Sequence, residues 1–418
     1  MTDHGNYSAG GATADFIDGA AAGIGVVPTF QPVVTLSDGK TVGYEALARW
    51  PSLPHLRPSV VFGRAAATGR LCQLDRACTT AVLRAALQAR LGPDHLLMIN
   101  CEPGTPHRHC RDDELMARAR DELQVVFEIT ERGLLRHPKA LLQKVAAMRS
   151  DGFAVALDDV GAHPDSLALL DVLAPDIIKL GIDLVQSRLS NHGALTVAGV
   201  LAHQERTGAV ILAGGVETKA HLERALAVGA TCGQGYRFGA AAPLPPSTPA
   251  AWWSLPAAPR REQSMPGSPF DAVRDHSPVS TARRSTVLAL CHHVESLASP
   301  AFDPPILLTA MQHGRHFGET TRDRYRRLAE GSALVAVFGE SLPQKLEPGI
   351  RGVILDAADP VSDEWAVIAL GPHISAAMVA REQPSSSGRN GDQHFDMVLT
   401  YDRKLVTAAA RALMDRLV

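Results

Sequence analysis

The sequence predicts an α/β protein made of a TIM-type (β/α)8 barrel with one antiparallel strand and a smaller C-terminal α/β domain. Three observations lead to this prediction. The 418 residues are too many for one average domain and suit two. From about residue 26 to 240, eight short apolar runs alternate with helix-like segments, as in a barrel. A stretch rich in Pro, Ser and Ala then precedes a second region of mixed helix and strand.

The predicted barrel strands are eight runs rich in Val, Ile and Leu. Most are apolar throughout rather than alternating, which is typical of strands buried on both faces. They cover residues 29–36, 41–50, 95–101, 124–130, 153–160, 176–181, 209–215 and 232–239. An Asp-Gly pair separates the first two runs and predicts a hairpin turn, so the first strand should run antiparallel to its neighbour.

Most of the later gaps between these runs hold helix-like segments. One is long and rich in Ala, Leu and Arg, at residues 59–90, and two shorter amphipathic ones lie at 139–151 and 218–229. The last of these begins with a Thr218 cap and ends at a Gly229 stop.

The chain therefore divides into four predicted parts. They are a flexible leader at 1–25, the barrel at 26–246, a linker at 247–284 and the second domain at 285–418. Within the second domain we expect helices at 287–298, 321–331 and 404–418, strands at 333–339, 352–357 and 364–371, and a mobile loop at 381–393.

Composition narrows the classes of partner. The formal net charge of −3 gives no reason to expect nucleic acid or an anionic membrane. No apolar run approaches the roughly 20 residues that cross a bilayer. The six cysteines are scattered and form no CxxC pair, which favours a reduced, cytoplasmic protein. The run from His107 to Cys110 is a possible metal ligand group, but no second ligand pair lies nearby in the sequence to support it.

Polar side chains gather toward the carboxyl ends of the predicted barrel strands, where the chemistry of such a barrel is carried. They are Glu45, Asn100, Glu128, Asp158, Asp159, Lys179 and Gln234, with Glu217 just after the seventh strand. Carboxylate and amide oxygens from four strands suit Mg²⁺ or Mn²⁺. The paired aspartates would allow a second ion, and two ions about 3.5–4 Å apart are a usual apparatus for phosphodiester cleavage. The alternative is that each carboxylate caps the next helix, but capping does not require an acid inside an apolar strand, as at Glu45.

These motifs resemble the EAL domain family, the cyclic di-GMP phosphodiesterases, over residues 27–246. The stretches that carry the resemblance are "FQPVV", "GYEALARW", "MIN", "FEITE", "LDDVG", "SLALLDVLAPDIIKL", "GGVET" and "QGYRFGAAAPLP". The resemblance implies cyclic di-GMP as the ligand, linear pGpG as the product, Mg²⁺ or Mn²⁺ as the cofactor, and a barrel with one antiparallel strand.

The resemblance also implies roles for individual residues. The residues implied to hold the first metal are Glu45, Asn100, Glu128 and Asp158. Asp159 would help with a second ion, Lys179 would position the attacking water, and Glu131 would steady the loop that shapes the metal site. The residues implied to line the dinucleotide site are Gln31, Leu47, Arg49 and Gln234, with Arg49 on a phosphate. Glu217 would complete the far side of the pocket with Gln234.

Two glycines depart from the family pattern. Gly181 stands where the family has an aspartate near the second metal, and Gly214 stands where it has a glutamate with a direct catalytic role. Residues 162–164 also differ from the usual loop. Asp183 lies two residues past Gly181 and would face the same way if the strand continued, although it would sit too far along. We therefore expect cyclic di-GMP binding with weak or absent hydrolysis. The alternatives are an active phosphodiesterase and a scaffold that binds no nucleotide.

Residues 285–418 resemble the DICT sensory domain. The resemblance rests on "QHGRHFGETTRDRYRRLA", "VAVFG", "DEWAVIALGPHISAAMVARE" and "FDMVLTYDRKLV". The histidines of this region suggest a metal or redox site, but solvated surface side chains are favoured: His292, His293, His313 and His316. A small ligand or protein partner at this domain, and a homodimer, are left open.

Overall fold

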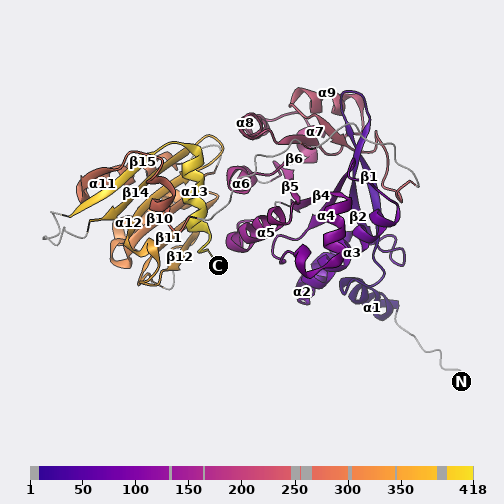
Figure 1. Ribbon diagram of the computed structural model, residues 1–418, viewed down its shortest axis with the longest axis horizontal. Helices are drawn as coiled ribbons and strands as arrows, with labels where there is room; N and C mark the ends of the chain where they lie inside the picture. The colour runs from indigo at the N-terminus through magenta and orange to yellow at the C-terminus, as the bar shows by residue number, and fades with distance from the viewer. Residues whose placement is uncertain are drawn as a thin grey trace, which may run out of the picture.

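The computed structural model describes residues 9–130, 134–162, 165–245, 255, 266–299, 304–343, 346–383 and 393–417. Within these residues the chain forms a barrel followed by a second, sheet-based domain (Figure 1). No helix in the described residues is long and apolar enough to cross a membrane.

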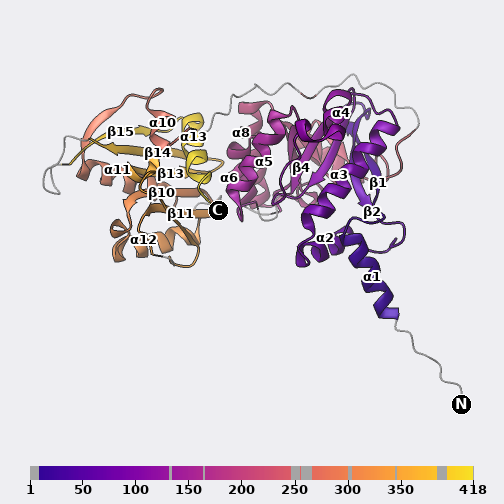
Figure 2. The same cartoon turned by 60° about the horizontal axis from the view of Figure 1, so that its bottom comes forward.

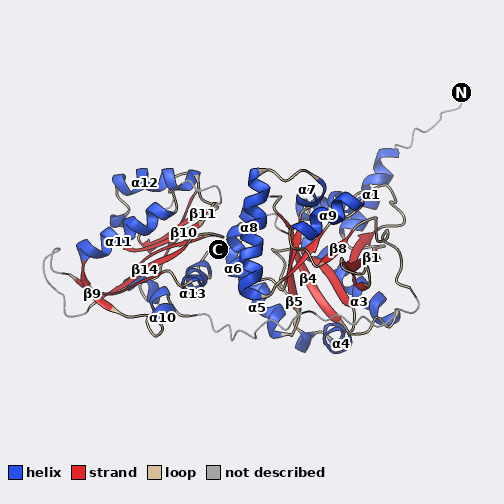
Figure 3. Ribbon diagram, turned by 90° about the horizontal axis from the view of Figure 1, so that it is seen from above, coloured by secondary structure: helices blue, strands red, loops and turns tan. Residues whose placement is uncertain are grey.

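Eight strands close into a barrel in chain order, as predicted (Figure 3). They are β1 (Val27–Thr35), β2 (Thr41–Arg49), β3 (Leu96–Cys101), β4 (Gln124–Thr130), β5 (Ala154–Val160), β6 (Ile177–Leu180), β7 (Val210–Ala213) and β8 (Cys232–Gln234). β1 is antiparallel to both β2 and β8, and the other neighbours are parallel. The predicted hairpin is present, and Gly39 in its turn has a φ of 72°, a conformation that glycine adopts without strain.

The helices of the barrel domain surround these strands. They are α1 (Ala9–Ala21), α2 (Pro58–Ala67), α3 (Leu71–Gln88), α4 (Glu114–Glu122), α5 (Pro138–Ser150), α6 (Asp165–Leu173), α7 (Ile182–Gln186), α8 (Asn191–Thr207) and α9 (Lys219–Ala227). The long segment predicted at 59–90 is two helices, because Gly69 takes a left-handed φ of 68° between them. Thr218 caps α9 as predicted, since its side chain accepts from the backbone N–H of His221.

The leader predicted at 1–25 is not flexible where the structure describes it. Residues 9–21 form α1, which packs beside α2. Ala20 and Ala21 are buried in a small apolar cluster with Trp50, and Asp18 pairs with Arg64. Burial of these small side chains holds the helix on the barrel, which the Ala- and Gly-rich composition of the segment did not reveal.

The second domain is built on a seven-stranded sheet in the order β12-β11-β10-β13-β14-β15-β9. Its strands are β9 (Ser280–Arg283), β10 (Ile306–His313), β11 (Leu334–Glu340), β12 (Ile350–Ile354), β13 (Glu364–Leu370), β14 (Ser375–Glu382) and β15 (His394–Thr400). Its helices are α10 (Pro269–Val273), α11 (Arg284–Leu297), α12 (Glu319–Glu330) and α13 (Arg403–Met414). Helices α11 and α12 cover one face, and α10 and α13 cover the other (Figure 3).

Part of the predicted linker at 247–284 belongs to this domain. Helix α10 buries Phe270 and Val273, and β9 pairs with β15 at the edge of the sheet. Most of the remaining linker residues and of the predicted mobile loop at 381–393 lie outside the described residues. The domain boundaries as a whole stay a prediction.

The two domains meet where α13 lies against the outer helices of the barrel (Figure 2). Asp171 on α6 accepts hydrogen bonds from Arg403 of α13 at 2.6 Å and from His203 of α8 at 3.0 Å. The guanidinium of Arg411 donates to the carbonyl of Val172. Burial favours the neutral form of Asp171, but the hydrogen bond from His203 and the charges of His203 and Arg403 hold its pKa well below the usual value. The carboxylate therefore stays charged at the interface.

We predict that Arg403→Met weakens this interface, because it removes a charged hydrogen bond from a largely buried carboxylate. The free energy of unfolding measured in urea should fall by about 2 kcal/mol. Lys219→Met is the control, since it removes a similar ion pair with Glu223 that is exposed on α9. Equal effects of the two substitutions would contradict the importance of the Asp171 contact.

Candidate metal centre

The polar side chains predicted from six of the strand ends meet inside the barrel. They come from β2, β3, β4, β5, β6 and β8: Glu45, Asn100, Glu128, Asp158, Lys179 and Gln234. Successive residues of a strand point to opposite faces. On β4, Phe127 joins the outer core beneath the helices while Val126 lies in the inner core, so Glu128 points into the barrel with Val126.

Lys179 lies at the centre of this group. Its Nζ atom is 3.0 Å from Glu45 Oε2, 3.2 Å from Glu128 Oε1 and 3.3 Å from Asp158 Oδ1. Lys179, Glu45 and Glu128 are all buried. A single ammonium group therefore faces three carboxylates in a region that water barely reaches.

Side-chain amides hold Glu45 in place. Asn100 Nδ2 donates to Glu45 Oε1 at 3.0 Å, and Gln234 Nε2 donates to the other oxygen of Glu45. Gln234 also donates to Gln31 Oε1 at 2.9 Å, and Gln31 donates to the carbonyl of Gly239. This chain of hydrogen bonds explains how a glutamate is accommodated in the apolar strand β2.

The charges of the group are not balanced. Burial and the neighbouring charge of Glu45 raise the pKa of Glu128 well above its usual value, against the opposing effect of Lys179. Burial alone would also raise the pKa of Glu45, but Lys179 and the amide hydrogen bonds lower it instead. Burial would lower the pKa of Lys179, but Asp158, Glu128 and Glu45 raise it well above the usual value. The site thus favours positive charge.

A divalent cation fits this set of donors. The Oε2 atom of Glu128 is buried and has no hydrogen-bond partner among the described residues. An unpaired buried carboxylate oxygen is costly, and a hard cation would relieve that cost. The surrounding ligands are carboxylate and amide oxygens from Glu45, Asn100 and Asp158, which is the chemistry that such an ion requires.

The two predicted aspartates differ in backbone conformation. Asp159 has a left-handed φ of 60°, which is uncommon for a residue other than glycine, and its backbone N–H donates to Asp158 Oδ1 at 2.8 Å. A Cβ atom at Gly181 would lie 3.0 Å from Asp159 Oδ1, and one at Gly214 would lie 3.3 Å from the carbonyl of Leu180. Gly181 is therefore next to Asp159, and Gly214, which follows β7, lies beside Leu180 at the end of β6.

Several predicted residues lie apart from the central group. Glu217 is exposed after β7, and its backbone N–H donates to His221. Leu47 and Arg49 lie further along β2, where Arg49 is exposed and donates to the carbonyl of Ala48. The roles assigned to these residues by resemblance stay predictions.

Asp183 does not substitute for the aspartate missing at Gly181. Strand β6 ends at Leu180, and Gly181 is the first residue of the turn into α7. Asp183 is therefore helical and exposed. It would have faced the same way as Gly181 only if the strand had continued, and the strand does not. Glu131, His163 and Pro164 lie outside the described residues.

A cavity of about 510 Å³ in the second domain was not predicted from the sequence. Its lining includes two arginines, two histidines and two acids: Arg284, Arg315, His313, His316, Asp363 and Glu382. The ring of His316 stacks on Trp365 at a centroid distance of 5.1 Å, so this histidine is not a solvated surface residue. The run "QHGRHFG" contains four of the residues that line this cavity. Neither the exposure of this run nor its proximity to Trp365 can be predicted from the sequence.

Two family models match the chain. The model described as "EAL domain" matches residues 20–241. The model described as "Sensory domain in DIguanylate Cyclases and Two-component system" matches residues 271–383. The first covers nearly all of the predicted barrel, and the second covers the predicted second domain as far as residue 383.

Curated relatives match the first half of the chain. The probable cyclic di-GMP phosphodiesterase PdeG of Escherichia coli K12 is 29% identical over 222 residues, which are 51% of this chain and 44% of PdeG. The cyclic di-GMP phosphodiesterase RocR of Pseudomonas aeruginosa is 29% identical over 224 residues, which are 52% of this chain and 57% of RocR. The chain thus spans about half the length of these relatives.

Solved structures similar to the chain include BlrP1 of Klebsiella pneumoniae. Its calcium/cy-diGMP complex matches with a TM-score of 0.47 and 29% identity, over 53% of this chain and 57% of that chain. Its manganese/cy-diGMP complex matches with a TM-score of 0.46 and 29% identity, over 52% of this chain and 56% of that chain.

We predict that Lys179→Met destabilises the protein and makes it more responsive to metal. Removal of the ammonium leaves three carboxylates uncompensated, which should cost about 3–5 kcal/mol of the free energy of unfolding. Added Mn²⁺ should restore part of that loss, because the ion supplies the missing positive charge. Thermal denaturation with and without Mn²⁺ measures both effects.

The control for this prediction is Lys144→Met. Lys144 is also buried, but its ammonium donates to the carbonyl of Glu102 and the hydroxyl of Thr105, outside the barrel site. Its substitution should destabilise the protein without a gain in the response to Mn²⁺. An identical Mn²⁺ response of the two variants would show that the ion does not bind beside Lys179.

Proposed function

The chain belongs to the EAL domain family, and we propose that its barrel binds cyclic di-GMP with a divalent metal while hydrolysing it weakly or not at all. One observation carries the proposal. The oxygen donors Glu45, Glu128 and Asp158 remain gathered inside the barrel around Lys179, whereas Gly181 and Gly214 supply no side chain at two positions where a carboxylate is expected.

We propose that the metal is Mg²⁺ or Mn²⁺. The side chains that would hold the first ion are Glu45, Asn100, Glu128 and Asp158, and Asp159 would contribute to a second. When bound, such ions supply the positive charge that polarises a phosphate oxygen. Lys179 would then be free to orient a water molecule through its ammonium group.

Residues around the open end of the barrel would bind the dinucleotide. The exposed guanidinium of Arg49 ends β2 and is able to pair with a phosphate, since arginine presents a planar fork of donors. Leu47 would offer an apolar contact, and Gln31 and Gln234 would contribute amide groups. Glu217 would complete the far side after β7.

The two glycines support reduced hydrolysis. Loss of one positioned acid–base group typically costs about 10²–10⁴ in rate, and two losses at one site need not multiply. Gly214 supplies no acid–base group, and Gly181 supplies no ligand beside Asp159. An active phosphodiesterase that forms pGpG is the alternative, and it would require other groups to activate water.

The second domain would act as the sensory part of the protein. The cavity beside Arg284, Arg315 and His316 is a candidate site for a small ligand, although a protein partner is the alternative. The contact between Arg403 and Asp171 on α6 would link the second domain to the barrel site. Helix α6 directly follows β5, the strand that carries Asp158. A homodimer and a cytoplasmic location stay predictions from the sequence.

We predict that the protein binds cyclic di-GMP in the presence of Mg²⁺ and that Arg49→Ala weakens binding at least tenfold. The arginine would lose a charged contact with a phosphate. Isothermal titration calorimetry measures the affinity, and Arg84→Ala on the exposed side of α3 is the control. A flat trace from folded wild-type protein would favour the scaffold alternative.

We predict that turnover by the wild type is low and that the double substitution Gly181→Asp with Gly214→Glu raises it tenfold or more. Neither glycine has a left-handed φ, and the nearest atoms to an added Cβ are 3.0 and 3.3 Å away, so small shifts would accommodate the side chains. Formation of pGpG at equal folded concentration is the measurement.

The matched control is Gly181→Asn with Gly214→Gln, which adds similar volume without carboxylates. It should bind cyclic di-GMP and remain slow. Rapid turnover by the wild type would refute the proposal of weak hydrolysis. A folded but inactive Asp/Glu variant would instead assign the defect to the altered loop at 162–164.

A further inference from the structure

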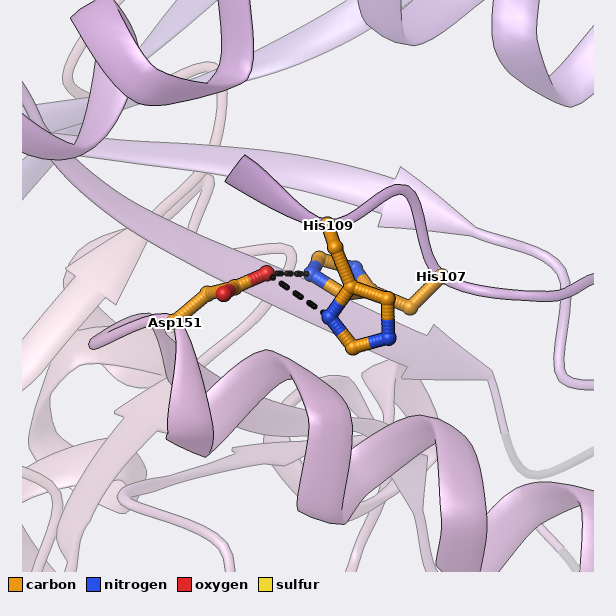
Figure 4. Close-up of side chains that lie close together, drawn as sticks. All are labelled: His107, His109 and Asp151. Carbon is orange, nitrogen blue, oxygen red and sulfur yellow. Dashed lines mark hydrogen bonds and ion pairs between the residues drawn. The ribbon is translucent and has the colours of Figure 1, made fainter. Parts of the chain in front are cut away.

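A group of side chains of the kinds that ligate metals lies away from the proposed nucleotide site (Figure 4). His107 and His109 belong to the segment between β3 and α4, and Asp151 follows α5 shortly before β5. One ligand atom from each residue lies within 4.8 Å of the other two. The sequence alone offered only the His107–Cys110 run, and the fold supplies Asp151 from about 40 residues further along the chain.

The barrel wall separates this group from the candidate metal centre. The ring of His107 packs edge-on against Phe127 and Phe153 at centroid distances of 5.8 and 5.9 Å. Phe127 faces the outer helices, whereas its neighbour Glu128 points into the barrel. Asp151 also precedes β5, so it lies at the end of the barrel opposite to the carboxyl ends of the strands.

The two histidine rings converge on a single oxygen atom of Asp151. Asp151 Oδ2 is 2.9 Å from His107 Nε2 and 3.3 Å from His109 Nδ1. The backbone N–H of Cys110 donates to the same oxygen at 3.1 Å. A carboxylate oxygen has two lone pairs, so the amide and the ring of His107 occupy both, and His109 makes only a longer ion-pair contact with it.

The same arrangement suits a small cation. Metal–nitrogen and metal–oxygen bonds of about 2.0–2.1 Å in a tetrahedral site place the ligand atoms about 3.3 Å apart. The separations of Asp151 Oδ2 from the two ring nitrogens, 2.9 and 3.3 Å, are close to this value. We propose that His107, His109 and Asp151 bind a zinc-class divalent ion on the outside of the barrel.

The ligand set selects the class of ion. Two imidazole nitrogens and one carboxylate oxygen suit Zn²⁺ or Co²⁺, whereas Mg²⁺ prefers oxygen ligands alone. Each ring would bind through the lone pair of one nitrogen and carry its proton on the other nitrogen.

The fourth position of the ion would belong to water. The Cys110 Sγ atom donates to the carbonyl of Met116, so this thiol is directed away from the other three residues. The His109 side chain is 34% exposed, which opens one side of the site to solvent. A bound ion would fasten the segment after β3 to the junction between α5 and β5.

The test is Co²⁺ binding to the full chain in excess Mg²⁺, which occupies oxygen-only sites. The wild type should bind one equivalent of Co²⁺ and show the visible absorption band of four-coordinate Co²⁺. Added Zn²⁺ should displace the Co²⁺ and abolish the band. His109→Ala should weaken binding at least tenfold. His192→Ala, an exposed histidine of α8, and Asp158→Asn, in the barrel site, should leave binding unchanged.

Three results would overturn the proposal. They are the absence of the band in wild-type protein, an unchanged band in His109→Ala, and loss of the band in Asp158→Asn, which would place the ion inside the barrel. Circular dichroism checks that each variant is folded. If His109→Ala is unfolded, His109→Gln replaces it and must show the same loss. These outcomes are independent of cyclic di-GMP binding and hydrolysis.

Discussion

The barrel interior depends on the ammonium group of Lys179. It is buried within about 3.3 Å of three carboxylates, each of which would be costly to bury alone. One positive charge cannot neutralise three negative ones. Burial and the excess negative charge therefore raise the pKa of Glu128. The interior is therefore a compromise in the absence of metal. It favours a further cation, and the amide chain through Asn100 and Gln234 keeps Glu45 oriented to receive it.

Much of this arrangement could be predicted from the sequence, because it is encoded in short apolar runs that polar residues interrupt. Glu45 interrupts an apolar run, and the order of such runs along the chain indicated which side chains would meet. The failures concern positions where the backbone turns. A strand extended past Leu180 would have turned Asp183 to the same face as Gly181, but the chain bends into α7 at Gly181. The meeting of His107 with Asp151 depends on the path of a whole βα unit, which periodicity does not encode.

Helix α6 connects the two domains with the altered part of the barrel. The segment at 162–164, where the sequence departs from its family, lies between Asp159 and this helix. The same helix carries Asp171, to which the second domain is joined by Arg403. A change in the second domain that moved Arg403 would act on a charged, largely buried carboxylate, so a small displacement would carry a substantial energetic cost. Helix α6 is thus the element of the barrel through which a movement of Arg403 would be transmitted.

The reversed direction of β1 has a consequence for how the chain reaches the barrel. Val27 at the start of β1 lies opposite Arg49 at the end of β2, so the polypeptide arrives at the rim formed by the carboxyl ends of β2 to β8 rather than at the opposite end. Helix α1 lies at that rim and packs near Trp50. Any affinity tag or fusion partner joined ahead of α1 would consequently lie near this rim of the barrel. Attachment at the carboxyl terminus, beyond α13, would leave that approach clear.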